Sequence, residues 1–370
     1  MNLSESSRFD SPLLIKDRKS GVTTPPPLIL CGNGNLELGR QTSKALGDLI
    51  CERNGFDTLR KEELQVEIFD NPTDKWPDQH IRSSRIKTEM TGRYVVIFNN
   101  PWPQPDKRLM ETFFLIDAAR TAGAGYITVV LPYFAYGRGD KKAEARTPIE
   151  ARVVARVLEM LGSNRIITLD LHAEQTTGSV LIPWDNLYSS HLMIPEIKIE
   201  IDPDNAVYMS TDTGGLKRAD AYNKRAEGKG IAFEIKARKL NADTSDPEVS
   251  AFVGNVDGRD VVIIDDESVS FSSIYLAAMS AVEHGARSVI AVVSHLKDGY
   301  SEDNTDFDKM WNLLNGMPSQ FRRLITTDTV DHLPEIRNHP LVKIIPTANF
   351  FAEIIWRNFS AVSLSPDLID

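Results

Sequence analysis

Residues 261–266 are Val261-Val262-Ile263-Ile264-Asp265-Asp266, an uninterrupted apolar run followed by two acids. Apolar runs that lack polar alternation are typical of strands covered on both faces by helices. A short polar loop and a helical pattern follow, so this segment predicts a strand, a loop and a helix. Similar apolar runs occupy residues 94–98, 126–131, 165–169, 206–209, 231–235, 288–293 and 324–326.

Helical patterns separate most of these runs. Residues 147–150 are Thr147-Pro148-Ile149-Glu150, the sequence of a capping box with proline in the first turn, and Gly162 predicts the end of that helix. A second helix is expected from about Ile274 to His284, ending at Gly285. Alternating strands and helices imply parallel sheets with right-handed crossovers, so the predicted fold class is α/β.

Length and composition bound the remaining possibilities. The chain has 370 residues, of which 41% are hydrophobic and 25% charged, and it is expected to fold as two globular domains. No apolar run approaches the roughly 20 residues that span a bilayer, and the N-terminus has no signal-peptide pattern, so we expect a soluble cytoplasmic protein with no membrane partner. Cys31 and Cys51 are isolated, which implies neither a disulfide framework nor a zinc site.

The charge is negative overall but unevenly distributed. A net charge of -10 argues against nucleic acid as a partner, because binding a phosphate backbone needs a basic face. Residues 217–239 nevertheless carry a net charge of +5, and residues 138–152 one of +2. These two basic segments suggest a small anionic ligand, although solvated helix faces would have the same composition.

Acidic, basic, amide or aromatic residues follow the predicted strands. They are Asn99-Asn100, Pro132-Tyr133-Phe134, Asp170-Leu171-His172, Ser210-Thr211-Asp212, Lys236-Ala237-Arg238, Asp265-Asp266 and Ser294-His295. Open α/β sheets bind ligands at the carboxyl ends of their strands, so we expect a composite site for a metal and an anion. Asp265 and Asp266 could accept hydrogen bonds from sugar hydroxyls or hold Mg²⁺, with a phosphate at the following helix, or they could be a helix N-cap and its neighbour.

Several motifs together resemble the ribose-phosphate diphosphokinase family. In chain order they are residues 131–142 (LPYFAYGRGDKK), 146–149 (RTPI), 170–175 (DLHAEQ), 182–187 (IPWDNL), 210–219 (STDTGGLKRA) and 236–238 (KAR). The resemblance extends from about residue 28 to the C-terminus. It implies two similar type I phosphoribosyltransferase-like domains with the active site between them, assembled as a homodimer or homohexamer.

The resemblance also implies domain boundaries. Residues 1–26 would be a polar tail, 27–187 the N-terminal domain and 188–340 the C-terminal domain, while 341–370 would form a helix and tail that return to the N-terminal domain. The implied reaction is Mg²⁺-dependent transfer of the β,γ-diphosphoryl group of ATP to the 1-hydroxyl of ribose 5-phosphate, releasing AMP and giving phosphoribosyl diphosphate. ATP and a phosphorylated ribose would then be the substrates.

Motif matching assigns the roles within this site. The resemblance implies that Lys236 and Arg238 are catalytic and that His172 and Asp212 bind Mg²⁺. Lys236 and Arg238 are alternate residues at a strand end, so both can reach one ligand and stabilise charge on the transferred group. The implied ATP-binding residues are Arg138, Gly139, Asp140, Lys142, Arg146 and His172. The implied ribose-phosphate-binding residues are Asp265, Asp266, Val269, Ser270, Phe271, Ser272 and Ser273.

The sequence departs from the family pattern in the ribose-phosphate loop. The family's motif in this loop is D-D-x-x-D-T-x-G-T. This chain has Val269 where the motif has its third acid and Ser272 where the motif has glycine, and Phe271 adds a bulky side chain. The glycine would let the backbone approach a phosphate closely. The acceptor could therefore be ribose 5-phosphate or a larger 5-substituted ribose such as ADP-ribose, or the chain could be a non-catalytic regulatory homologue.

Three other segments also depart from the pattern. Gly139 replaces the glutamine of the family's Arg-Gln-Asp, which removes an amide expected near adenine. The family's N-terminal F-S-D-G-E segment, which helps a neighbouring subunit hold adenine, has only Phe69–Thr73 as a near match. Residues 298–319 also depart from the family pattern and are expected to form an added loop or helix.

Overall fold

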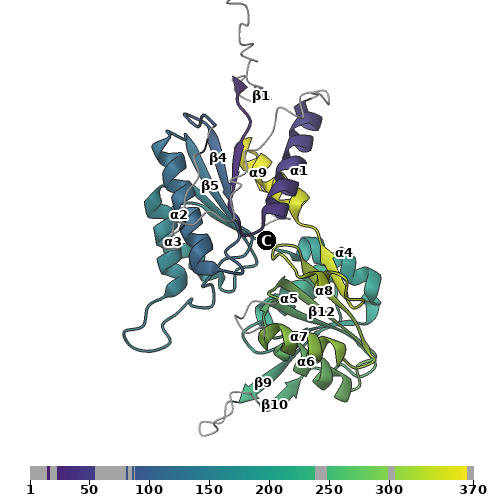
Figure 1. Ribbon diagram of the computed structural model, residues 1–370. Helices are drawn as coiled ribbons and strands as arrows, with labels where there is room; N and C mark the ends of the chain where they lie inside the picture. Colours follow the sequence, from purple (N-terminus) through teal and green to yellow (C-terminus); the bar gives the residue numbers. More distant parts are fainter. Residues whose placement is uncertain are drawn as a thin grey trace, which may run out of the picture.

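Most of the described strands belong to two large sheets, each within its own lobe of the molecule (Figure 1). The computed structural model describes residues 15–16, 23–54, 81, 86, 88–237, 248–298 and 305–364. The first sheet is parallel and has the strands β3 (Leu28–Cys31), β4 (Tyr94–Phe98), β5 (Tyr126–Leu131), β6 (Arg165–Leu169) and β7 (Trp184–Leu187), in that order. A short antiparallel pair, β1 (Ile15–Lys16) and β2 (Thr23–Thr24), is separate.

The second sheet has the order β10-β9-β8-β11-β12-β13-β14 and is parallel except for the antiparallel edge pair β9–β10. Its strands are β8 (Ala206–Ser210), β9 (Ile231–Ala237), β10 (Glu248–Val253), β11 (Asp260–Ser268), β12 (Ser288–Leu296), β13 (Phe321–Thr327) and β14 (Val342–Ile345). The α/β fold class and all eight predicted strands are confirmed. β11 and β12 extend several residues further than their apolar runs, into the polar residues that follow.

Helices cover both faces of each sheet. In the first lobe, α2 (Pro105–Thr121) and α3 (Glu150–Leu161) pack on one face, and α1 (Leu36–Asn54) and α9 (Ala348–Phe359) on the other. In the second lobe, α6 (Ser272–Glu283), α7 (Thr305–Asn315) and the short α8 (Pro334–Arg337) face α4 (Ser190–Glu200) and α5 (Leu216–Ala226) across the sheet. The 3-10 turns Glu174–Ser179 and Pro203–Asn205 complete the described elements. No helix in the described ranges is long and apolar enough to cross a membrane.

The predicted capping box at the start of α3 is wrong. The helix begins at Glu150 with Ile149 at the N-cap, and no side chain caps it. The Thr147 hydroxyl instead donates to Glu144 O (2.8 Å) and accepts from Glu144 N (3.2 Å), so a tighter local turn takes up the capping group. The predicted end is confirmed, because Gly162 has the left-handed φ of 111° that favours glycine after a helix.

Helix α9 follows the second sheet in sequence but packs in the first lobe. Its Phe351 is fully buried and meets Phe98 of β4 edge to face, with ring centroids 5.7 Å apart. Glu353 pairs with Arg53 of α1 at 2.8 Å, and the Arg53 guanidinium lies over Trp356 at 3.8 Å. The chain therefore crosses between the lobes more than once, while the predicted domain boundaries at 187/188 and 340/341 stay predictions.

A buried histidine links the end of β12 to the start of α8. His332 Nδ1 lies 2.6 Å from Asp298 Oδ1, its Nε2 lies 2.8 Å from Thr327 O, and Leu333 N donates to Asp298 Oδ2 at 2.7 Å. Burial opposes a charge on the ring, but the hydrogen bond and the negative charge of Asp298 outweigh it and raise the pKa of His332. A protonated ring donates from both nitrogens, as this geometry requires.

We expect His332→Gln to lower the free energy of unfolding by roughly 1–3 kcal/mol at about pH 6, because a buried charge-assisted hydrogen bond is lost. The folded pKa is raised, so this contribution is complete below an unfolded pKa of about 6.5 and is lost as the pH rises through the folded pKa. Urea unfolding of both proteins across this range measures the difference. A difference that stays constant or grows with pH would contradict the prediction.

Candidate active site

The carboxyl ends of the two sheets meet around one cavity of about 960 Å³, here called the interlobe cavity. It is lined from the first lobe by the loop after β5 and the segment after β6, and from the second lobe by the loops after β8 and β11. The predicted site residues that line it are Arg138, Asp140, His172, Asp212, Asp265, Asp266, Val269, Ser270, Phe271, Ser272 and Ser273. Residues far apart in sequence thus converge on a single polar site.

Other predicted residues lie outside this lining. Gly139, Lys142 and Arg146 belong to the loop before α3 but do not border the cavity, and Lys142 and Arg146 are exposed. The backbone of Lys236 lies near the end of β9, although its side chain is not described. Arg238 and Phe69–Thr73 lie outside the described residues. Their roles stay predictions.

Three residues expected to face a ligand instead join the two lobes. His295 Nε2 lies 2.9 Å from Leu169 O, the Ser294 hydroxyl donates to Asp170, and Asn100 Nδ2 donates to Thr329 O. All three are buried, and burial lowers the pKa of His295. The expectation that every polar strand end would form part of a ligand site is corrected here, because buried polar groups at the lobe contact need partners of their own.

Asp266 is held by side chains from both lobes. Arg218 of α5 donates from Nη1 to Asp266 Oδ1 at 2.8 Å and from Nη2 to Leu171 O at 3.2 Å, while His172 Nδ1 lies 2.8 Å from Asp266 Oδ2. Burial disfavours the Asp266 charge, but Arg218 above all, and then His172, hold the pKa of Asp266 far below its usual range. The hydrogen bond to Asp266 raises the pKa of His172.

The pKa of the neighbouring acid, Asp265, is shifted in the opposite direction. It accepts hydrogen bonds from Thr211 Oγ1 (3.2 Å) and from the Asp266 backbone N–H (3.0 Å). Burial and the adjacent charge of Asp266 raise the pKa of Asp265 to about 7. The acidic pair therefore consists of Asp266, whose charge is favoured by its cationic partners, and Asp265, whose charge is opposed by burial and by its neighbour.

The two predicted metal ligands border the same cavity. Asp212 is exposed, and its Oδ1 accepts from the N–H groups of Gly214 (2.8 Å) and Gly215 (3.1 Å), while His172 keeps 41% of its side chain exposed. Within the described ranges no group of three or more His, Cys, Asp or Glu could hold a metal. Mg²⁺ commonly takes one or two carboxylates and completes its shell with water and phosphate oxygens, so these residues fit an ion that arrives with a nucleotide.

The segment that leads into α6 is shaped by Phe271. This residue has a left-handed φ of 62° and is only 1% exposed, packed in the core of the second lobe. Its burial offsets the cost of a left-handed backbone in a residue other than glycine. Ser270 Oγ and Ser272 Oγ lie 3.1 Å apart beside the start of the helix. Phe271 thus anchors the loop in the core, while the neighbouring serines border the cavity.

The loop after β5 has a steric reason for its unusual glycine. A Cβ atom at Gly139 would lie 2.9 Å from Glu150 Cβ and 2.2 Å from Glu150 Oε2. The family's glutamine could not stand here without a shift of the backbone or of Glu150. On either side of it, Asp140 Oδ2 accepts from Gln175 Nε2 at 3.1 Å, and Arg138 Nε forms an ion pair with Glu267.

Two buried charges of the site have no counterpart in the motif predictions. Glu267 directly follows the acidic pair on β11, and Lys297 follows β12; Lys297 Nζ lies 2.9 Å from Glu267 Oε2 and 3.2 Å from the Tyr133 hydroxyl. Arg218 also had no assigned role, although it lies within a quoted motif. In the sequence, Glu267 is visible as a third consecutive acid and Lys297 as a lone lysine after an apolar strand. Neither pattern shows which residue the side chain pairs with.

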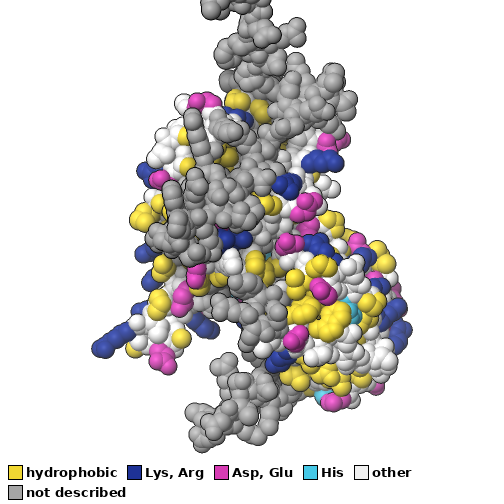
Figure 2. Space-filling model, viewed as in Figure 1, with side chains coloured by type: hydrophobic (Ala, Val, Ile, Leu, Met, Phe, Trp, Pro, Cys, Tyr) yellow, Lys and Arg dark blue, Asp and Glu magenta, His cyan; other side chains and the backbone are white. Residues whose placement is uncertain are grey.

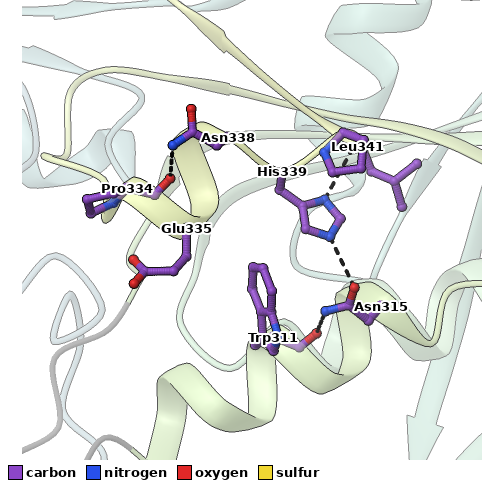
Figure 3. A pocket seen from close by; sticks show the side chains of 8 residues that line it. Trp311, Asn315, Pro334, Glu335, Asn338, His339 and Leu341 are labelled. Atoms are coloured by element: carbon purple, nitrogen blue, oxygen red, sulfur yellow. Dashed lines mark hydrogen bonds between the residues drawn. The ribbon is translucent and has the colours of Figure 1, made fainter.

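A second cavity of about 600 Å³ lies between α7 and α8, away from every predicted site residue (Figure 3). It is lined by Trp311, Asn315, Pro334, Glu335, Asn338, His339, Pro340 and Leu341. His339 Nε2 lies 3.4 Å from Asn315 Oδ1, and Leu341 N donates to His339 Nδ1 at 3.2 Å.

Hydrophobic side chains gather on the visible face of this lobe (Figure 2).

Comparison with known proteins places the chain in a family. Residues 28–162 match the model for the N-terminal domain of ribose phosphate pyrophosphokinase. The Ribose-phosphate pyrophosphokinase of Agrobacterium fabrum is 32% identical over 308 residues, covering 82% of this chain and 93% of that protein. The chain belongs to the ribose-phosphate pyrophosphokinase family. A relative from Marinomonas sp. is 30% identical over 343 residues, covering 91% of this chain and 97% of its own length.

The solved structures support the same fold. The phosphoribosylpyrophosphate synthetase from Mycobacterium smegmatis superposes with a TM-score of 0.75 at 24% identity, covering 90% of this chain and 99% of that one. The expected architecture of two parallel-sheet units flanked by helices is therefore confirmed. As a member of the ribose-phosphate pyrophosphokinase family, the chain is an enzyme.

Replacement of Arg218 tests the buried charge network. We expect Arg218→Met to lower the free energy of unfolding by roughly 3–5 kcal/mol, because Asp266 would be left buried beside one weaker partner. Lys224→Met is the control: Lys224 is exposed and pairs with Asp220 at 2.6 Å on the same helix, and its loss should cost less than about 1 kcal/mol. Urea unfolding compares the two, and equal small losses would contradict the network's role.

Proposed function

We propose that the chain is a Mg²⁺-dependent diphosphokinase that transfers the β,γ-diphosphoryl group of ATP to the 1-hydroxyl of a ribose 5-phosphate-type acceptor, releasing AMP. The observation that carries this proposal is the interlobe cavity, where Arg138, His172 and Asp212 border the same space as residues 265–273. The relatives from Agrobacterium fabrum and Pasteurella multocida are named Ribose-phosphate pyrophosphokinase, which supports the same reaction class.

The residues of the cavity suggest how the substrates are held. Asp266 is occupied by Arg218 and His172, so the proposal assigns the ribose hydroxyls to Asp265, whose oxygens can each accept a second hydrogen bond. The acceptor's phosphate would lie at the start of α6, against its N–H groups and the Ser270 and Ser272 hydroxyls. This places the acceptor mainly on the second lobe.

The donor would lie across the lobes. Arg138 would contact the ATP phosphates, and His172 and Asp212 would hold Mg²⁺ together with phosphate oxygens. The bound Mg²⁺ would neutralise charge on the transferred group. Lys236 and Arg238 would stabilise the charge that develops as the bond to AMP breaks. The chain's contribution is therefore alignment and charge neutralisation, with no covalent intermediate.

A different acceptor is the alternative that the loop before α6 supports. Without the family's glycine at Ser272 and its third acid at Val269, this loop differs where a simple 5-phosphate would bind. The same transfer onto a larger 5-substituted ribose such as ADP-ribose would use Asp265 and the 1-hydroxyl in the same way.

Acceptor specificity separates these alternatives. The purified chain is incubated with Mg-ATP and either ribose 5-phosphate or ADP-ribose, and AMP is followed by chromatography. We expect AMP release that depends on an acceptor; release with ribose 5-phosphate supports the first reaction, and release with ADP-ribose alone supports the second. Silence with both acceptors would contradict the proposed diphosphokinase reaction.

Lys236→Ala tests the predicted catalytic lysine. We expect at least a roughly 100-fold fall in turnover with less than about 1 kcal/mol lost from the free energy of unfolding, because the charge acts on the transferred group. Lys229→Ala, which removes an exposed lysine that pairs with Asp204 at 3.1 Å just before the same strand, is the matched control and should retain turnover. Full turnover in Lys236→Ala would remove this residue from the mechanism.

A further inference from the structure

Glu267 is a buried carboxylate with no role in the proposed chemistry. It is the eighth residue of β11, only 6% exposed, and borders the interlobe cavity. A charge buried to this extent must be compensated by nearby cations. The structure supplies two cations, one from each lobe, and they meet different oxygens of the same carboxylate.

Lys297 is the cation from the second lobe. Its Nζ lies 2.9 Å from Glu267 Oε2 and is almost as buried as the acid, with 7% of its side chain exposed. It also reaches the first lobe, because Nζ donates to the Tyr133 hydroxyl at 3.2 Å and lies 4.9 Å and 5.5 Å from the ring centres of Tyr133 and Trp102. Lys297 therefore neutralises Glu267 from a fixed position between the lobes.

Arg138 is the cation from the first lobe, and its situation differs. Its Nε forms an ion pair with Glu267 Oε1, yet 58% of its side chain is exposed and it borders the cavity. Arginine has five N–H donors, so a carboxylate held at Nε leaves the terminal nitrogens of the guanidinium for another acceptor. Lys297 pairs with Oε2 and Arg138 with Oε1, and because Oε1 has no hydrogen-bond partner among the described residues, its contact with Arg138 is an electrostatic one.

We infer that Glu267, held in place by Lys297, is a positioning residue that fixes the Arg138 guanidinium at the cavity wall, oriented for the polyphosphate of the nucleotide. This inference rests on the ATP site of the proposed function and adds to it a residue outside the motif assignments. An exposed arginine on a loop has many rotamers, and a ligand that must order it loses affinity. A preformed ion pair removes part of that cost before the nucleotide arrives.

A competing role for Glu267 would change nucleotide affinity in the opposite direction. If Glu267 merely competed with phosphate for Arg138, its removal would release the guanidinium and tighten nucleotide binding. If Glu267 were only structural, nucleotide affinity would change no more in its variants than in a protein with another ion pair removed. Nucleotide affinity, measured without turnover, therefore distinguishes positioning from both competition and plain structural support.

The experiment measures the dissociation constant of Mg²⁺-α,β-methylene-ATP by calorimetry. The variants are Glu267→Gln, which keeps the shape of the side chain, and Glu267→Gln/Lys297→Met, which removes both buried charges and keeps the site neutral if the single variant does not fold. Glu200→Gln is the control: it removes an ion pair with Arg323 (3.2 Å) outside the interlobe cavity.

We expect both Glu267 variants to bind the analogue roughly ten-fold more weakly, and Glu200→Gln to bind it as the unmodified chain does. In an Arg138→Met background the Glu267→Gln change should have no further effect, because it acts through Arg138. Unchanged or tighter binding in both Glu267 variants, a full additional loss in the Arg138→Met background, or failure of the unmodified chain to bind the analogue would overturn the inference.

The assay also separates this inference from the proposed function. A chain that binds the analogue with the expected dependence on Glu267, yet releases no AMP with either acceptor, would keep the positioning role and exclude the reaction. A chain that releases AMP while its Glu267 variants bind the analogue normally would keep the reaction and exclude the positioning role.

Discussion

The structure depends on compensating two adjacent buried carboxylates at the end of β11. Asp266 and Glu267 are successive residues of β11, and each is paired with one cationic partner from its own lobe and one side chain from the other. Asp266 takes Arg218 and His172, and Glu267 takes Lys297 and Arg138. Separating the lobes would take one partner away from each acid, at a high cost in free energy.

The side chains that pair across the two lobes also border the interlobe cavity. His172 and Arg138, the first-lobe partners, are also the residues assigned to the nucleotide, and they keep 41% and 58% of their side chains exposed. The second-lobe partners, Arg218 and Lys297, are far more buried, with 19% and 7% exposed. The second lobe thus supplies a fixed charged frame, and the first lobe supplies the side chains that can still meet a ligand.

Much of the fold could be predicted from the sequence, because the inner strands of both sheets are covered on both faces and so are continuously apolar. The strands that escaped prediction include β7 and β14 at the sheet edges, which mix polar with apolar residues and buried with half-buried ones. Motifs located the cavity residues, and only the family resemblance supplied their roles. The pairing of Arg138 with Glu267 joins residues 129 positions apart through the fold, and no local periodicity encodes such a contact.

The basic segment 217–239 shows why a count of charges is a weak guide to a ligand. Its net charge of +5 suggested an anion site, yet several of its cations are engaged by the protein itself. Arg218 is paired with Asp266, Lys224 with Asp220 and Lys229 with Asp204. Lys217 lies on the cavity wall, as does Lys141 from the other basic segment. The net charge of a segment therefore overstates the positive charge that is open to a ligand, because salt bridges within the protein take up part of it.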